Sequence, residues 1–377
     1  MNWKIPLFKI YWEKDDIGSV SKVIKRGSYW TTGPENKKLE EKIADYIGKK
    51  YALSFNSGTS ALHADLLAHD VKDSEIIVPS FTFISTANSV ILANAKPVFA
   101  EIEDKSYGLD PEDVKEKITN KTKALIPVHY GGAPCKEIKA LQEIAEDHKL
   151  FLVEDAAESL GSKIDKIKIG TFGHSAIFSF CQNKVITAGE GGLTVTDSKQ
   201  LFEKLKLIRS HGRLENKNDY FSTTSEFDYV ELGYNYRMPS INAAIVLSQF
   251  NKLDKIIKMR REKANYYNKK LSKIKTIKPP FCPNTNFHVF QMYTIQLDDE
   301  LSRLQLQKNL TKAGIMTKVY FKPIHLTTFY KEKFNYRKGD LPITEKISKK
   351  VLTLPLYPSL TFNEMEYIFN EIKNCFV

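Results

Sequence analysis

The sequence predicts an α/β protein, with a large domain built on a mostly parallel sheet flanked by helices and a smaller C-terminal α+β domain. Between residues 51 and 196, short runs rich in β-branched and aromatic residues alternate with amphipathic helical stretches. This alternation is typical of βαβ units, whose helices cover both faces of a parallel sheet. The length of 377 residues also indicates two domains, because one hydrophobic core rarely organises so long a chain.

Seven runs are expected to be the strands of the large sheet. They are YALSF (51–55), EIIVP (75–79), PVFAEI (97–102), ALIPVHY (124–130), LFLVED (150–155), AIFSF (176–180) and GLTVT (192–196). Between them, the amphipathic stretches at residues 60–69 and 135–149 are expected to form covering helices. Ligands of such sheets gather at the carboxyl ends of the strands, so the site is expected at that edge.

After about Ser240 the pattern changes to that of a smaller α+β domain. The elements expected there are one long helix (241–271), a break at Pro279-Pro280, a strand (288–297), a helix starting near Asp299 and a strand (315–321). We therefore expect a large domain over residues 1–245 and a small domain over residues 246–377, bridged by the long helix.

The basic composition does not by itself predict nucleic-acid binding. The formal net charge is +11, but the basic residues are mixed with acids along helical stretches such as KKLEEK, which is typical of solvated faces. A basic surface also favours the approach of a phosphorylated small substrate. No nucleic-acid partner is expected.

The start of the chain and its cysteines favour a cytoplasmic protein. The first residues, MNWKIPLFKIYWEKDD, contain no apolar run long enough for a signal peptide or a membrane anchor. The four cysteines are scattered and lack metal-ligand spacing, as expected of free thiols in a reducing compartment. We expect neither a membrane partner nor a metal.

Three segments carry residues that are suited to ligand binding or catalysis. Residues 56–61 (NSGTSA) follow a predicted strand and precede a predicted helix, so their backbone N–H groups could bind a phosphate; a plain helix cap is an equally good interpretation. Residues 153–158 (VEDAAE) place Asp155 at the end of a buried strand, where a carboxylate can pair with a protonated ring nitrogen. The alternative is a capping aspartate with Glu158 in solvent.

The third segment is FSFCQNK (178–184), which ends in Lys184 and is followed by the glycine-rich VITAGEGG (185–192). A lysine between short apolar strands is partly desolvated, which favours its neutral, nucleophilic form. Together the three segments supply what pyridoxal phosphate requires: a phosphate cup, an acid for the pyridinium nitrogen and a lysine for the Schiff base.

The chain resembles the DegT/DnrJ/EryC1/StrS family of sugar aminotransferases, which have the type I pyridoxal-phosphate-dependent transferase fold. The segments that carry the resemblance are GSYWTTGPENKKLEEKIADYIG, NSGTSAL, VPSFTFISTANSV, EDAAESLGS, FSFCQNK with ITAGEGG, LGYNYRMPSINAAI, KPIHLTTFY and LTLPLYPSLT. They run in order along nearly the whole chain, so they specify the family much better than the substrate.

The resemblance implies roles for individual residues. Lys184 corresponds to the Schiff-base lysine, which also shuttles a proton, and Asp155 to the partner of the pyridinium nitrogen. Phe83 matches the aromatic residue that stacks on the cofactor ring, and core packing is the alternative. The residues that match the phosphate cup are Gly58, Thr59 and Ser179.

The resemblance also implies a homodimer whose active site lies at the subunit interface. Asn235, in GYNYRM, matches a residue that reaches the phosphate from the neighbouring subunit, although it could simply be a turn residue. Glu158 stands near the cofactor's phenolic oxygen, where many relatives have Gln, and a carboxylate there must share a proton or turn away. His174 stands where many relatives have Asp, and no function is assigned to it.

We expect an aminotransferase that moves the amino group of glutamate to a nucleotide-linked keto-sugar in amino-sugar biosynthesis. The ITAGEGG turn together with EDAAESLGS favours C4 of a 4-keto-6-deoxyhexose over C3. Candidate contacts to the sugar or its diphosphate are Trp30, Thr31, Lys322 and His325.

Other functions remain open at this point. An aminocyclitol (keto-inositol type) aminotransferase is the enzymatic alternative, because similar turns occur in those relatives. A non-catalytic regulatory protein that binds pyridoxal phosphate would ignore every amino donor. A nucleic-acid-binding module would bind random DNA in a salt-sensitive way, but it leaves the Lys184 segment unexplained. Family members that perform dehydration carry His at the lysine position, so Lys184 argues against that branch.

Overall fold

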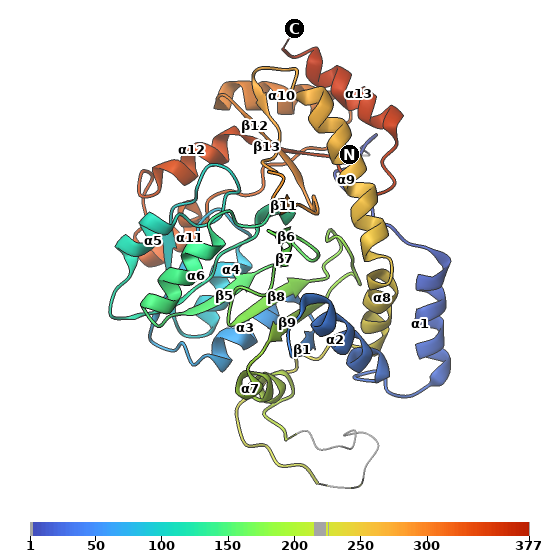
Figure 1. The fold of residues 1–377 in the computed structure, drawn as a ribbon, viewed down its shortest axis with the longest axis vertical. Helices are drawn as coiled ribbons and strands as arrows, with labels where there is room; N and C mark the ends of the chain where they lie inside the picture. The colour runs from blue at the N-terminus through green and yellow to red at the C-terminus, as the bar shows by residue number, and fades with distance from the viewer. Residues whose placement is uncertain (1–2, 215–223, 225, 377) are drawn as a thin grey trace.

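A seven-stranded sheet forms the centre of the molecule in the computed structural model, which describes residues 3–214, 224 and 226–376 (Figure 1). In spatial order its strands are β1 (Tyr51–Phe55), β9 (Gly192–Thr196), β8 (Ser175–Ser179), β5 (Phe151–Asp155), β4 (Thr122–Leu125), β2 (Glu75–Pro79) and β3 (Lys96–Ala100). Strand β9 runs in the direction opposite to that of the other six strands, which are parallel to one another. Each of the seven predicted runs overlaps one of these strands, and the mostly parallel sheet is confirmed.

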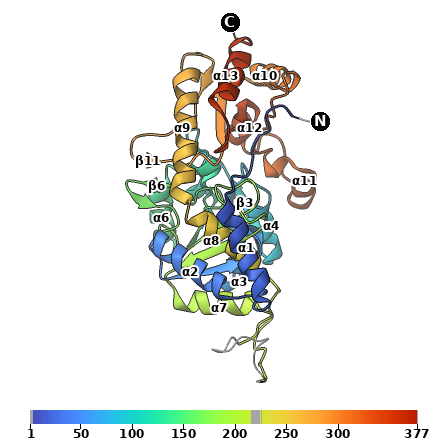
Figure 2. The same cartoon turned by 90° about the vertical axis from the view of Figure 1, so that its right-hand side faces the viewer.

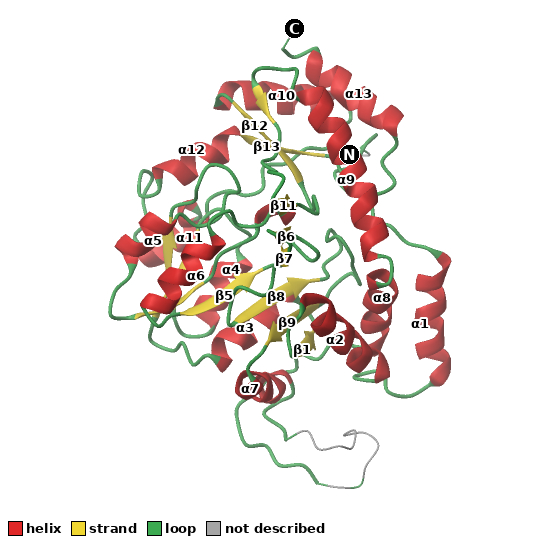
Figure 3. Cartoon of the chain, viewed as in Figure 1, coloured by secondary structure: helices red, strands yellow, loops and turns green. Residues whose placement is uncertain are grey.

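Both faces of this sheet are buried, because successive apolar side chains point to opposite sides. Ile77 belongs to one hydrophobic core, whereas its neighbours Ile76 and Val78 belong to the other. The helices that pack on the first face are α2 (Pro34–Ile47), α5 (Pro111–Lys117), α6 (Ile138–Asp147) and α8 (Ser240–Phe250). The second face is covered by α3 (Gly58–Ala68), α4 (Ser85–Leu92) and α7 (Lys199–Arg209). Outside them, α1 (Lys14–Arg26) packs on α8, as Figure 3 shows.

A separate hydrophobic core organises the C-terminal part of the chain. Its elements are α9 (Leu253–Leu271), β10 (Ile277–Lys278), β12 (Tyr293–Leu297), α10 (Glu300–Lys312), β13 (Val351–Leu354) and α13 (Phe362–Lys373). The three strands form an antiparallel sheet in the order β10-β12-β13. Ile5, near the start of the chain, is buried in the same core. Figure 2 shows α9 running from the large sheet up to α13.

The structure has further short elements outside these two groups. They are η1 (Tyr130–Gly132), β6 (Lys163–Ile164), β7 (Ile167–Lys168), β11 (Asn286–Phe287), η3 (Ile324–Leu326), α11 (Thr328–Phe334) and α12 (Pro342–Lys350). Strands β11, β6 and β7 form a small antiparallel sheet between the large sheet and the C-terminal core (Figure 1). Among the described residues, no helix is long and apolar enough to cross a membrane.

Two sequence expectations for the C-terminal part were wrong. The predicted long helix is interrupted between α8 and α9, where the buried Lys252 amine reaches α1 and pairs with Asp15 (2.6 Å) and Asp16 (2.8 Å). The predicted strand at residues 315–321 is absent, and within it only Ile315 and Lys318 form single bridges. The division between residues 245 and 246 stays a proposal.

Candidate active site

The three segments singled out in the sequence meet at the carboxyl edge of the large sheet. Strand β5 ends at Asp155, and β8 ends at Ser179. A Cβ atom added to Gly58, the first residue of α3, would lie 2.9 Å from the Ser179 Cβ atom, so the two segments are in contact. Gly192, which pairs with both Phe55 and Ser179, comes so close that an added Cβ would lie 2.2 Å from the Ser57 carbonyl oxygen. Only glycine allows this approach.

The start of α3 is both a capped helix end and an arrangement suited to an anion. Ser57 Oγ accepts a hydrogen bond from the Ser60 N–H (3.0 Å), and Ser60 Oγ accepts one from the Ser57 N–H (3.1 Å). This cap leaves Gly58 and Thr59 as the first two helical residues, at the positive end of the helix dipole. Together with the Ser179 hydroxyl beside them, they form a cup suited to a phosphate.

Asp155 is a buried carboxylate whose two hydrogen-bond donors are neutral. Its Oδ2 accepts from the Thr86 hydroxyl (2.8 Å), and its Oδ1 accepts from the Ala157 N–H (3.2 Å). Burial raises the pKa of Asp155, and the bonds from Thr86 and Ala157 and the charge of Lys184 offset part of this shift. A cationic ring nitrogen beside Asp155 would stabilise the ionised form further.

Lys184 and Glu158 form an ion pair at the same edge. The Lys184 Nζ lies 3.1 Å from Glu158 Oε1, and the exposed fractions of the two side chains are 13% and 9%. The interpretation of Glu158 as a solvated residue is therefore wrong, because its second oxygen accepts from the buried Gly131 N–H (2.8 Å). Lys184 lies in a turn closed by its own N–H, which donates to the Cys181 carbonyl (3.0 Å).

Phe83 is exposed and is not part of the hydrophobic core of the chain. The residue is 58% exposed, and its ring centroid lies 6.1 Å from that of Phe321. The Phe83 carbonyl accepts from the N–H of Thr86, the residue whose hydroxyl bonds to Asp155, so Phe83 lies close to the buried acid. Thr86 was missed by the sequence analysis, because a threonine in the first turn of a helix carries no signal of its own.

The other predicted contacts lie in different parts of the structure. Asn235 is exposed, and its carbonyl accepts from the Asn56 side chain (3.3 Å), which places it beside the phosphate cup of its own chain. Lys322 is exposed and follows Phe321, which lies near Phe83. Trp30 and Thr31 connect α1 to α2, and the Trp30 indole N–H donates to the Val23 carbonyl (3.1 Å).

His325, in contrast, faces the interior of the protein. Its side chain is fully buried, and its two ring nitrogens lie 2.7 Å from Ser80 Oγ and 3.2 Å from Glu345 Oε1. In this arrangement the imidazole has no free nitrogen for a sugar or a diphosphate. The structure thus does not bring His325 together with the other site residues.

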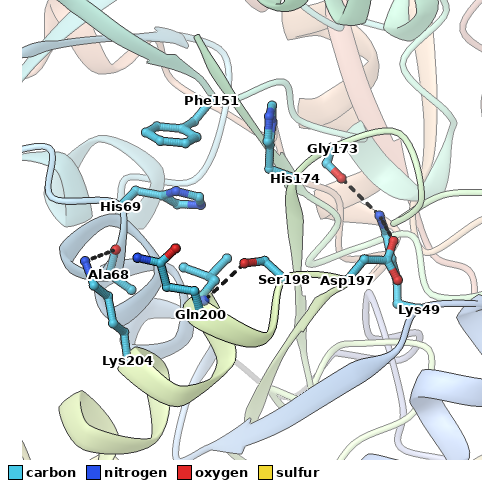
Figure 4. A pocket seen from close by; sticks show the side chains of 11 residues that line it. Lys49, Ala68, His69, Phe151, Gly173, His174, Asp197, Ser198, Gln200 and Lys204 are labelled. Atoms are coloured by element: carbon cyan, nitrogen blue, oxygen red, sulfur yellow. Dashed lines mark hydrogen bonds and ion pairs between the residues drawn. The ribbon is translucent and has the colours of Figure 1, made fainter. Parts of the chain in front are cut away.

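A cavity of about 420 Å³ lies at the opposite edge of the sheet, where β5 and β8 begin (Figure 4). Phe151, His69 and His174 line it, and His174 Nδ1 accepts from the Leu152 N–H (3.1 Å). The Asp65 Oδ2 lies 3.6 Å from His69 Nε2. This fully buried carboxyl group accepts a hydrogen bond from the Ser175 hydroxyl (2.8 Å). His174 therefore lies at the far edge of the sheet from Lys184 and Asp155.

Asp65 should make the folding stability depend on pH. Burial raises the pKa of Asp65 to about 7, whereas an unfolded aspartate titrates near 4, so between these values only the folded state keeps the proton. Stability therefore falls as pH rises through this window. Asp65→Asn removes the effect, so its stability relative to the wild type should rise by about 2 kcal/mol between pH 5 and pH 8.

This change should be measured as the difference in denaturant unfolding free energy between variant and wild type at each pH. Asp104→Asn is the matched control, because the Asp104 side chain is 64% exposed. A difference between Asp65→Asn and wild type that is the same at both pH values would contradict the prediction.

The residues at the carboxyl edge fit pyridoxal phosphate. The cup is suited to a phosphate, and the Lys184 amine lies within the same cluster of charges as Asp155. The hydrogen bonds to the buried Asp155 come from neutral donors, so a protonated ring nitrogen would add a charged one. Among the described residues, no group of three His, Cys, Asp or Glu side chains is arranged to hold a metal ion.

Comparison with known proteins gives matches along nearly the whole chain. The model of the DegT/DnrJ/EryC1/StrS aminotransferase family matches residues 11–373. The spore coat polysaccharide biosynthesis protein SpsC of Bacillus subtilis (strain 168) is 32% identical over 368 residues, which cover 96% of this chain and 94% of SpsC.

Solved structures agree with this match. Helicobacter pylori PseC, an aminotransferase involved in the biosynthesis of pseudoaminic acid, is 29% identical, with a TM-score of 0.90 and 99% of both chains covered. NtdA from Bacillus subtilis, solved with its cofactor PMP, is 27% identical, with a TM-score of 0.86 over 96% of this chain and 81% of NtdA.

Proposed function

Since the chain belongs to the DegT/DnrJ/EryC1/StrS aminotransferase family of pyridoxal-phosphate-dependent enzymes, we propose that it transfers the amino group of glutamate to a nucleotide-linked keto-sugar. The amino-sugar product would enter polysaccharide or glycan synthesis, and SpsC is a polysaccharide biosynthesis protein. We propose C4 of a 4-keto-6-deoxyhexose as the position of amination, on the strength of the ITAGEGG and EDAAESLGS segments. The observation that carries the proposal is the cluster of Lys184, Asp155 and the Gly58–Ser179 cup at one edge of the sheet.

In this proposal each residue has a distinct task. Pyridoxal phosphate, when bound, supplies an aldehyde that combines with amines and a ring that stabilises negative charge at the reacting carbon. The Lys184 amine holds the aldehyde between reactions and moves a proton at the substrate carbon. Asp155 pairs with the ring nitrogen and keeps it protonated. Gly58, Thr59 and Ser179 bind the phosphate, and Phe83 covers the ring.

The proposal is tested by the visible absorption spectrum of the purified protein with pyridoxal phosphate, before and after addition of glutamate. We expect a band from the lysine-bound cofactor that glutamate removes, with release of 2-oxoglutarate. Keto-sugar nucleotides are then screened for restoration of the band, and NMR of the product locates the new amine. A band that no amino donor changes would instead support a protein that binds the cofactor without turnover.

We further propose a cytoplasmic homodimer in which the Asn235 side chain of one subunit reaches the phosphate cup of the other, while its backbone carbonyl accepts from Asn56 of its own chain. The apolar residues shortly before Asn235 support a dimer interface at this place. In the single chain, Tyr229, Val230 and Leu232 are 54%, 51% and 82% exposed. Exposed apolar residues in such a group are typical of an interface.

The substitution Leu232→Asp should weaken this dimer, because a carboxylate would lose its hydration at an apolar interface. We expect the dimer dissociation constant to rise by about 100-fold, which corresponds to the loss of a well-packed interface residue. Sedimentation velocity over a range of concentrations measures this change. Leu301→Asp, at a position 78% exposed on α10, is the matched control. A dimer that is unaffected by Leu232→Asp would refute this choice of interface.

A further inference from the structure

The Glu158 carboxylate is fixed between a backbone donor and the Lys184 amine. Its Oε2 accepts from the Gly131 N–H (2.8 Å) and its Oε1 from Lys184 Nζ (3.1 Å), so each oxygen has its own donor. Both side chains are largely buried, with exposed fractions of 9% and 13%. The hydrogen bond from the Lys184 amine to Oε1 therefore fixes the direction of that amine, while the Gly131 N–H holds the other carboxylate oxygen in place.

The backbone that holds Glu158 is itself fixed by the segment at residues 289–292. Gly131 has a φ of 62°, in the left-handed region, and its carbonyl accepts from the Met292 N–H (3.0 Å). A Cβ added to Gly132 would lie 2.7 Å from Val289 Cγ2 and 2.9 Å from the Gln291 nitrogen. The turn and the segment therefore pack at the closest distance that glycine permits.

The same segment also reaches Lys184 from the other side. The side-chain amide of Gln291 donates to the carbonyl of Asn183, the residue directly before Lys184, at 2.6 Å. Gln291 is only 5% exposed. Lys184 is thus held at its amine, through Glu158 and Gly131, and at its backbone, through Gln291.

We propose that Glu158 and Gln291 are positioning residues that orient the Lys184 amine toward the cofactor aldehyde before the cofactor binds. This inference rests on the proposed function and deepens it. The catalytic residue remains Lys184, and the two positioning residues act through it. Their effect is expected in the rate at which the empty protein captures pyridoxal phosphate, since a displaced nucleophile reacts more slowly.

The experiment starts from cofactor-free protein mixed with pyridoxal phosphate in a stopped-flow spectrophotometer. The appearance of the visible band gives the capture rate, and borohydride reduction followed by peptide mass spectrometry shows whether Lys184 is the modified residue. We expect Glu158→Ala to slow capture by about 30-fold and Gln291→Leu by about fivefold. Glu112→Ala is the matched control, because Glu112 is 78% exposed in an ion pair with Lys115 and should leave the rate unchanged.

Two further variants separate positioning from general damage to the fold. Glu158→Gln keeps one acceptor oxygen, so it cannot serve Gly131 and Lys184 separately, and its rate should fall between those of Glu158→Ala and wild type. The double variant Glu158→Ala, Gln291→Leu should be slowed by less than the product of the single effects, because both residues act on Lys184. Thermal unfolding of each empty protein reports on the fold independently of the rate.

The outcomes distinguish the inference from the proposed function. If the wild type captures the cofactor on Lys184 and both Glu158 variants do so at the wild-type rate, the positioning role is refuted. If Glu158→Ala does not fold, a slowed Glu158→Gln with normal thermal unfolding supports the role, and an unslowed one refutes it. If the wild type itself forms no band, the proposed function fails.

Discussion

Lys184→Ala is expected to abolish amino transfer, with a loss in turnover on the order of 10⁴-fold or more, because no other group replaces a covalent nucleophile. The visible band of the lysine-bound cofactor should also be absent. Lys184 is the lysine that lies beside Glu158 at the carboxyl edge of the sheet. The measurement combines the absorption spectrum with release of 2-oxoglutarate from glutamate.

Removal of Lys184 also leaves the buried Glu158 carboxylate without its cation, so a loss of activity must be separated from a loss of stability. Lys184→Gln is useful here, because its amide still donates toward Glu158 but cannot form a bond to the aldehyde. Both variants should be inactive while keeping the far-UV circular dichroism of the wild type. Lys37→Ala, at a position 81% exposed on α2, is the control. Turnover by Lys184→Gln within tenfold of wild type would eliminate Lys184 as the nucleophile.

Asp155→Asn should lower turnover by about 100- to 1,000-fold, the usual cost of removing an electrostatic group aimed at developing charge. The asparagine has nearly the same shape, but it carries no charge for a ring nitrogen. It also has one oxygen where the carboxylate accepts separately from Thr86 and Ala157. The effect should appear in the turnover of both half-reactions, measured in single-turnover experiments.

Thr86→Val provides the comparison for Asp155→Asn. It removes the hydroxyl that bonds to Asp155 but leaves the carboxylate in place. We expect a loss of about tenfold, since one hydrogen bond to a charged group is worth less than the charge itself. Equal activity of Asp155→Asn and wild type would refute the ring-nitrogen role.

The large sheet could be predicted because each of its strands carries its own signal. Runs such as EIIVP bury side chains on both faces, and the structure assigns Ile76 and Ile77 to different cores. Residues 315–321 show a similar pattern but form only single bridges, because apolar alternation does not specify a pairing partner. The interruption between α8 and α9 was not predictable locally, since the partners of Lys252 lie in α1.

In the candidate site, the residues at strand ends could be predicted from the sequence, whereas the contacts between distant segments could not. Asp155 ends a strand and Lys184 follows one, and the topology of a parallel sheet brings strand ends to one edge, so local sequence suffices to group them. The contacts of Thr86, Gly131 and Gln291 depend on how distant segments pack, and no short motif encodes them. His325 shows the reverse case, because a histidine that looked available from its segment is buried against Glu345.

Helix α9 belongs to two cores at once. Its first turns place Leu253, Ile256 and Ile257 against the large sheet, and its last turns place Tyr267 and Leu271 in the C-terminal core. If the C-terminal part of a relative is grafted onto this chain with the whole of α9, the first turns of the foreign helix therefore bring foreign side chains into the core of the large sheet. A chimaera joined within α9, between the two groups of side chains, preserves both sets of native contacts. Exchange of C-terminal parts between such relatives is then a matter of choosing a helical junction rather than a loop.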